Sequence, residues 1–220
     1  ISQADLDARV KKVLAAKLWL GLNKYQKVNT NNLINDLNNA SSKTLVQRLA
    51  DAAVTVVKSD RGLRRFDNKR KTAIVSIGID KAQDFEKGMA SQLADYTQIY
   101  VKGNETEEQL DSLMKLARDH KQVILAIHDN RSRPRSELEL SKDVKLFIDK
   151  LAGRRTISVL FTNPYALNSV DVMRSSSIVL TYQNDDFMQK AAIKLFTKQL
   201  KATGKLPVTI NKNLKFGEGI

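Results

Sequence analysis

The chain has 220 residues, of which 42% are hydrophobic, so it can bury a sizeable core as one large domain or as a domain with an arm. It contains no cysteine, which excludes disulfides and thiolate chemistry, and it lacks an apolar run long enough to span a membrane. The formal charge of +13 suggests an acidic partner. Aromatic residues are not interleaved with the basic clusters, however, and this disfavours nucleic acid.

The first quarter of the chain reads as a helical arm followed by a linker. Residues 3–20 carry apolar side chains at three- and four-residue steps, which predicts an amphipathic helix that ends near Gly21. Residues 23–40 are rich in asparagine and predict a linker with a short helical piece at 32–37. Ser41 or Ser42 then caps a helix that runs to about Ala53, and a short strand follows over residues 54–57.

From Lys71 onward, strand patterns alternate with helix patterns. Strands are predicted at 72–77, 98–101, 122–127, 156–161 and 177–181. Helices are predicted at 81–94, 106–119, 136–151 and 185–202, with capping-box spacings that begin at Thr106 and Ser136, and a further short helix after Leu167. The alternation predicts an α/β fold: a mainly parallel sheet between helices, Rossmann- or flavodoxin-like, with an N-terminal helical arm.

Polar side chains follow two of these strands where ligand sites form in open α/β sheets. The strand at 122–127 leads into His128, Asn130 and an arginine-bearing loop, and the strand at 156–161 stops at Thr162-Asn163-Pro164. The side chains that we single out as candidates for a substrate cleft or a domain interface are His128, Asn130, Arg131, Arg133, Asn163 and Tyr165.

Several kinds of chemistry lack their usual sequence signals. Neither the dinucleotide-binding glycine fingerprint nor a Walker loop occurs, and two histidines without cysteine disfavour a zinc site, so no cofactor is expected. His128 suits general acid–base chemistry, but no nucleophile or second carboxylate is fixed near it by spacing. A capping or interface role for His128 therefore stays open beside a catalytic one.

Four segments, in order, resemble one enzyme family. They are residues 8–17 with 20–22, 53–58, 159–167 and 204–208, whose sequences are ARVKKVLAAK with LGL, AVTVVK, VLFTNPYAL and GKLPV. The chain resembles the carboxyl-terminal part of glycoside hydrolase family 3 β-N-acetylhexosaminidases, and in particular the Bacteroidetes-type forms. One departure is Leu63-Arg64-Arg65, where the family usually has a Leu-Pro-Leu turn.

The resemblance implies a domain order and a partner. Residues 1–22 would be the last helix of a catalytic barrel, residues 23–53 a linker and packing helix, and residues 54–220 the α/β sandwich domain. The family's nucleophile and its acid/base pair lie in the barrel, so this chain alone is expected to be inactive. The parent would release terminal β-linked N-acetylglucosamine by a retaining mechanism, in the periplasm or at the cell surface.

Two other interpretations remain open. The chain could be a basic module that binds nucleic acid or another acidic polymer, in which case its binding would weaken steeply with salt. It could also be a self-contained enzyme that uses His128, in which case the isolated chain would show turnover.

Overall fold

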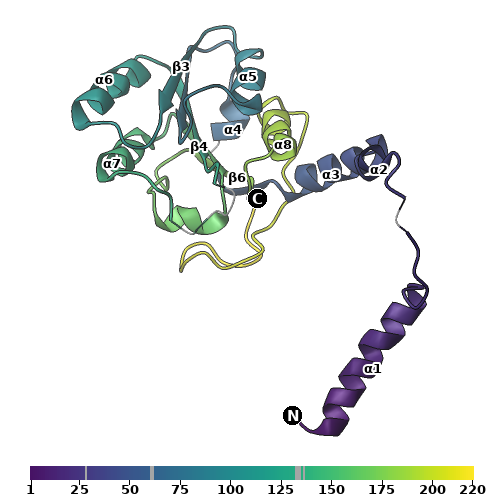
Figure 1. Ribbon diagram of the computed structural model, residues 1–220. Helices are drawn as coiled ribbons and strands as arrows, with labels where there is room; N and C mark the ends of the chain where they lie inside the picture. Colours follow the sequence, from purple (N-terminus) through teal and green to yellow (C-terminus); the bar gives the residue numbers. More distant parts are fainter. Residues whose placement is uncertain (28, 60–61, 132–134, 136) are drawn as a thin grey trace. The chain divides into compact units, whose positions relative to one another are not determined.

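The computed structural model describes residues 1–220 except 28, 60–61, 132–134 and 136. Contacts between residues divide the chain into two compact units, 1–43 and 44–220. The first unit holds helix α1 (Gln3–Trp19) and the short helix α2 (Leu33–Leu37), as Figure 1 shows. Ser2 and Asp5 form a capping box at the start of α1, and no residue of α1 is buried. The domain boundaries inferred from the resemblance, after residues 22 and 53, stay predictions.

The second unit is built on a six-stranded sheet in the order β1-β6-β5-β4-β2-β3. Its strands are β1 (Thr55–Ser59), β2 (Thr72–Ile77), β3 (Tyr96–Val101), β4 (Gln122–His128), β5 (Thr156–Phe161) and β6 (Ser177–Leu180). Strands β2 to β6 are parallel to their neighbours, and β1 is antiparallel to β6 at one edge. The predicted mainly parallel α/β fold is confirmed.

Helices cover both faces of this sheet because alternate strand residues point to opposite sides. In β4, Val123, Leu125 and Ile127 join one buried cluster, whereas Ile124 and Ala126 join the other. Helices α6 (Glu107–Arg118) and α7 (Lys142–Leu151) pack in the first cluster, and α5 (Asp84–Ala90) and α8 (Asp186–Phe196) pack in the second (Figure 1). Helix α3 (Ala40–Ala53) adds Ala50 to the second cluster.

Several helix boundaries differ from the sequence-based ones. Helix α7 begins after Ser141, whose side chain accepts a hydrogen bond from the Val144 amide, so the predicted start at Ser136 is wrong; Ser136 itself lies outside the described residues. Helix α5 begins after Gln83, because the Glu86 carboxylate accepts the Gln83 amide proton there. Helix α8 ends at Phe196, since Lys198 turns the chain with a φ of 61°.

Other local features also depart from expectation. Helix α3 begins at Ala40, and Asn39 rather than a serine accepts the Ser42 amide proton. The short helix expected after Leu167 is a 3-10 helix, η1, that already begins at Pro164 (Pro164–Asn168). Residues 62–65, which lie between β1 and β2, form the short helix α4 (Gly62–Arg65).

The C-terminal tail folds back on itself and closes over the first cluster. The Leu206 amide donates to Glu218 O at 2.7 Å, and the Ile210 amide donates to Leu214 O at 2.9 Å. Leu206, Ile210 and Leu214 are all buried in that cluster. The tail is therefore an integral part of the second unit.

Within the described part of the chain, no helix is both long enough and apolar enough to cross a membrane. The same residues contain no group of three histidine, cysteine, aspartate or glutamate side chains placed to hold a metal ion.

Candidate functional site

The carboxyl ends of the parallel strands bring the candidate residues to one edge of the sheet. Strand β4 ends at His128, which lies opposite Phe161, the last residue of β5. We call this edge, with the loops that follow β2, β4, β5 and β6, the carboxyl edge.

His128 lies in a buried polar contact with Glu86 of α5. Its Nε2 is 2.8 Å from Glu86 Oε1, and the two side chains are 0% and 1% exposed. Its Nδ1 lies 3.2 Å from Asn184 Oδ1, and its ring stacks on Phe161 with the centroids 4.7 Å apart. Both ring nitrogens face an oxygen atom, so this geometry leaves neither nitrogen for a ligand.

Glu86 is a buried carboxylate whose hydrogen-bonding capacity is used within the domain. Oε1 accepts a hydrogen bond from Ser76 Oγ at 2.9 Å, and Oε2 accepts one from the Gln83 amide at 3.0 Å. Burial by itself raises the pKa of Glu86, but the hydrogen bond and charge of His128, with the bonds from Ser76 and Gln83, hold the pKa below its ordinary value. Glu86 is therefore an ionised anchor for this edge.

Amide side chains form the outer rim above this pair. Asn130 Oδ1 accepts hydrogen bonds from Gln83 Nε2 at 3.0 Å and from Asn184 Nδ2 at 2.6 Å. The buried Gln189 of α8 donates to Gln83 Oε1 at 2.9 Å and to Asn184 Oδ1 at 2.8 Å. Asn130 is exposed, whereas Gln83 and Asn184 are half-buried. Amides both donate and accept, so this rim suits hydroxyl or amide groups of an uncharged polar ligand.

Gly78 allows the loop after β2 to pass close to this network. Its φ is +85°, and a Cβ atom at this position would lie 2.4 Å from the carbonyl oxygen of His128. Any other residue would therefore both strain the backbone and push His128 away.

Asp129 and Arg131 form a second, separate cluster on the same edge. Arg131 donates from Nε to Asp129 Oδ1 and from Nη2 to Oδ2, both at 2.8 Å, and from Nη1 to Glu139 Oε1 at 3.0 Å. Burial raises the pKa of Asp129, but the hydrogen bonds and charge of Arg131 outweigh it and hold the pKa below its ordinary value. Arg131, predicted as a contact for a ligand or a domain, is thus largely occupied by carboxylates of its own loop.

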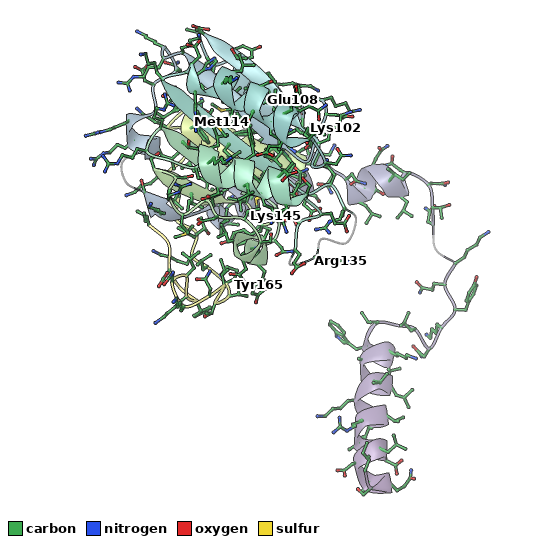
Figure 2. All side chains as sticks on the ribbon, turned by 90° about the vertical axis from the view of Figure 1, so that its left-hand side faces the viewer. Lys102, Glu108, Met114, Arg135, Lys145 and Tyr165 are labelled. Carbon is green, nitrogen blue, oxygen red and sulfur yellow. The ribbon has the colours of Figure 1, made fainter. Side chains whose placement is uncertain are left out.

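Asn163 and Tyr165 lie beside the end of this loop. Asn163 Nδ2 donates to the Arg135 carbonyl at 2.5 Å, and Asn163 Oδ1 accepts the Tyr165 amide proton at 3.0 Å, which caps η1. The side chain of Tyr165 is exposed, and Figure 2 shows it at the surface near η1. Arg133, also singled out from the sequence, lies outside the described residues.

Four further side chains of this edge were not predicted from the sequence: Gln83, Glu86, Asn184 and Gln189. Gln83 and Glu86 stand at a capping-box spacing, and Asn184 follows the last strand of the sheet, so two weak signals were present. Neither signal indicates that these side chains meet His128, which is 42 residues away from Glu86 in the chain.

The sequence matches no family model and no curated protein. Solved structures do resemble it. A glycoside hydrolase family 3 β-N-acetylglucosaminidase from Paenibacillus sp. matches with a TM-score of 0.65 at 18% identity, over 96% of this chain and 40% of that one. The β-glucoside phosphorylase BglX matches with a TM-score of 0.65 at 18% identity, over 96% and 39%. A β-glucosidase from Listeria innocua in complex with gluconolactone matches with a TM-score of 0.69 at 15% identity, over 96% and 32%.

The chain shares the fold of a part of these enzymes. It spans well under half of the length of each, so each contains a further region that this chain does not match. At these identities the likeness establishes the fold, and the chemistry has to be argued separately.

Proposed function

We propose that this chain is the non-catalytic C-terminal α/β domain of a glycoside hydrolase family 3 β-N-acetylhexosaminidase of the Bacteroidetes type. The observation that carries the proposal is the match of 96% of the chain to a 40% part of a β-N-acetylglucosaminidase of that family. Helix α1 makes up 17 of the 220 residues, so a match of this extent includes at least about half of α1 as well as the sheet. The order of these two parts along the chain, first a helical arm and then a sheet domain, agrees with the order of the four resembling segments.

The two buried carboxylates of the carboxyl edge are not placed for the chemistry of the proposed parent. A retaining glycosidase uses a carboxylate nucleophile and an acid/base group about 5 Å apart on the two sides of the glycosidic bond. At the carboxyl edge, Glu86 is buried beneath His128, and Asp129 is paired with Arg131. We therefore place the catalytic groups in an N-terminal barrel of the same polypeptide and give this domain the role of a cleft wall or brace, with the amide rim facing the sugar.

The test is turnover by the full-length polypeptide and by the 220-residue chain. The full-length protein should hydrolyse 4-nitrophenyl N-acetyl-β-glucosaminide with retention of configuration, and the chain alone should show no turnover. Preference for 4-nitrophenyl β-glucoside, or a requirement for phosphate, would overturn the substrate assignment. Turnover by the isolated chain that is lost in His128→Ala would instead establish a self-contained enzyme.

The proposed location is the periplasm or the cell surface, where β-N-acetylglucosaminides of glycan fragments occur. Fractionation of cells that express the full-length protein tests this location, and recovery of the protein in the cytoplasmic fraction would contradict it.

A further inference from the structure

The amino ends of the parallel strands, at the edge opposite the carboxyl edge, carry a hollow of about 200 Å³ lined with basic side chains. It lies beside the starts of β2, β4 and β5. Its lining includes Arg65, Arg70, Lys121, Arg154 and Arg155, and none of the described residues that line it is acidic. Five cations around so small a space repel one another unless an anion lies among them.

Two further hollows adjoin this one, and each shares a different pair of cations with it. A hollow of about 740 Å³ shares Arg65 and Arg70 with it and adds Arg64 and Lys198. A hollow of about 130 Å³ shares Arg154 and Arg155 with it and adds Arg118 and Lys150. We call the three together the amino-edge surface.

Little negative charge compensates this surface. Among the described residues that line its hollows, the one carboxylate is Asp67, whose Oδ2 is 3.6 Å from Arg70 Nε. The carbonyl end of α6 accounts for one of the cations, because Arg155 Nη1 donates to the carbonyls of Arg118 at 3.3 Å and His120 at 2.8 Å.

Other cations of this surface do not bind the end of a helix in this way. The side chains of Arg65, Lys121 and Arg154 are exposed, and within the described residues they make no hydrogen bond or ion pair. These three side chains are therefore available to a ligand that carries negative charges.

We propose that the amino-edge surface binds a linear anionic glycan whose acidic groups are spaced along the three hollows. The extended run of hollows favours a polymer over a single small anion. The aromatic rings of the largest hollow, Phe66 and Phe196, are buried and packed edge-to-face with centroids 5.1 Å apart, so they offer no platform for nucleic-acid bases. The choice of a glycan rests on the proposed function. In that case the amino-edge surface binds the part of an acidic substrate polymer that lies away from the cleft.

The experiment measures binding of the 220-residue chain to polygalacturonate, which carries one carboxylate per sugar, by isothermal titration calorimetry. Dextran is the neutral control, and single-stranded oligo(dT) tests for binding of nucleic acid. Polygalacturonate should bind with an affinity that falls as NaCl is raised. In the double variant Arg65→Gln/Arg154→Gln, the affinity should fall at least about tenfold, because two charge-assisted contacts are lost.

The matched control is Lys142→Gln/Lys145→Gln on α7, which removes the same charge from a different surface; Figure 2 labels Lys145. It should leave the affinity within about twofold. Equal loss in both double variants, or no loss in the first, overturns the proposal, as does binding of oligo(dT) without binding of polygalacturonate. If Arg65→Gln/Arg154→Gln does not fold, Arg64→Gln/Lys121→Gln replaces it with the same expectation.

These outcomes are independent of the glycosidase assay. Failure of polymer binding while the full-length protein still cleaves the small aryl substrate removes this proposal alone. Absence of aryl glycosidase activity removes the proposed function, whatever the chain binds.

Discussion

At the scale of single residues, the carboxyl edge is organised by an acidic side chain, Glu86, that no sequence motif links to His128. Glu86 lies under His128 and holds that ring, the start of α5 and Ser76 of β2 together. Removing a buried carboxylate of this kind is costly, because the groups that donate hydrogen bonds to it are left without a partner.

We predict that Glu86→Gln changes the stability of the domain in a pH-dependent way. The pKa of Glu86 is lowered in the folded state, so its contribution is present above the unfolded-state value, near 4.5, and is lost as the pH falls through the folded-state pKa. At neutral pH the free energy of unfolding of the variant should be lower by about 1.5–3 kcal/mol, because hydrogen bonds to a charged group usually contribute that much. Urea unfolding at a series of pH values measures both effects.

The control for this prediction is Glu108→Gln, which removes a carboxylate from the exposed side of α6. Its stability should follow the wild type within about 0.5 kcal/mol at every pH. If Glu86→Gln loses as much stability at acid pH as the wild type does, the ionisation of Glu86 does not cause the pH dependence of stability.

At the scale of elements, α1 and the C-terminal tail differ in what they bury. Every residue of α1 is exposed, including the apolar stripe that contains Leu6, Val10 and Leu14. The tail instead buries Leu206, Ile210 and Leu214 and donates a hydrogen bond from the Ile220 amide to Val56 O at 3.0 Å.

We predict that deletion of residues 1–22 changes the free energy of unfolding of the sheet domain by less than about 0.5 kcal/mol, because these residues belong to the other compact unit, 1–43. Deletion of residues 204–220 should cost several kcal/mol, since three buried leucine or isoleucine side chains are removed. Urea unfolding followed by circular dichroism compares the two deletions. A large loss on deleting residues 1–22 would mean that α1 packs against the sheet domain.

At the scale of the whole molecule, the two edges of the sheet carry different chemistry. The carboxyl edge presents amides and the exposed ring of Tyr165 above the buried contact between His128 and Glu86, and the amino edge presents cations. The proposed function turns the carboxyl edge toward the sugar at the catalytic cleft, and the further proposal assigns the amino edge to the rest of an acidic polymer.

We predict that Tyr165→Ala in the full-length protein lowers kcat/KM about tenfold or more, because one hydrogen bond or ring contact at the cleft is lost. The matched control is Tyr96→Ala at the amino end of β3, which has a similarly exposed ring, 43% against 39%. Kinetics on the aryl substrate should be measured beside thermal unfolding. Unchanged kcat/KM in Tyr165→Ala would make this edge ordinary surface, and lost stability with normal kinetics would make it a brace between domains.

The sequence by itself determined the fold class and most of the strands. The predicted bounds of β2 and β5, 72–77 and 156–161, agree with the structure, because buried parallel strands are short apolar runs whose signal is local. The capping box at Thr106 is likewise confirmed, since a cap involves only residues three positions apart.

Only the tertiary structure decided which side chains meet. His128 reaches Glu86 across 42 positions and Asn184 across 56, and the basic hollow joins residues from 65 to 155, because parallel strands align their ends whatever their separation in the chain. The antiparallel pairing of β1 and the end of α8 at a left-handed Lys198 were likewise set by packing and not by local propensity. Periodicity reports which residues are buried, whereas the identity of a buried residue's neighbours depends on the order of the strands, which no local pattern encodes.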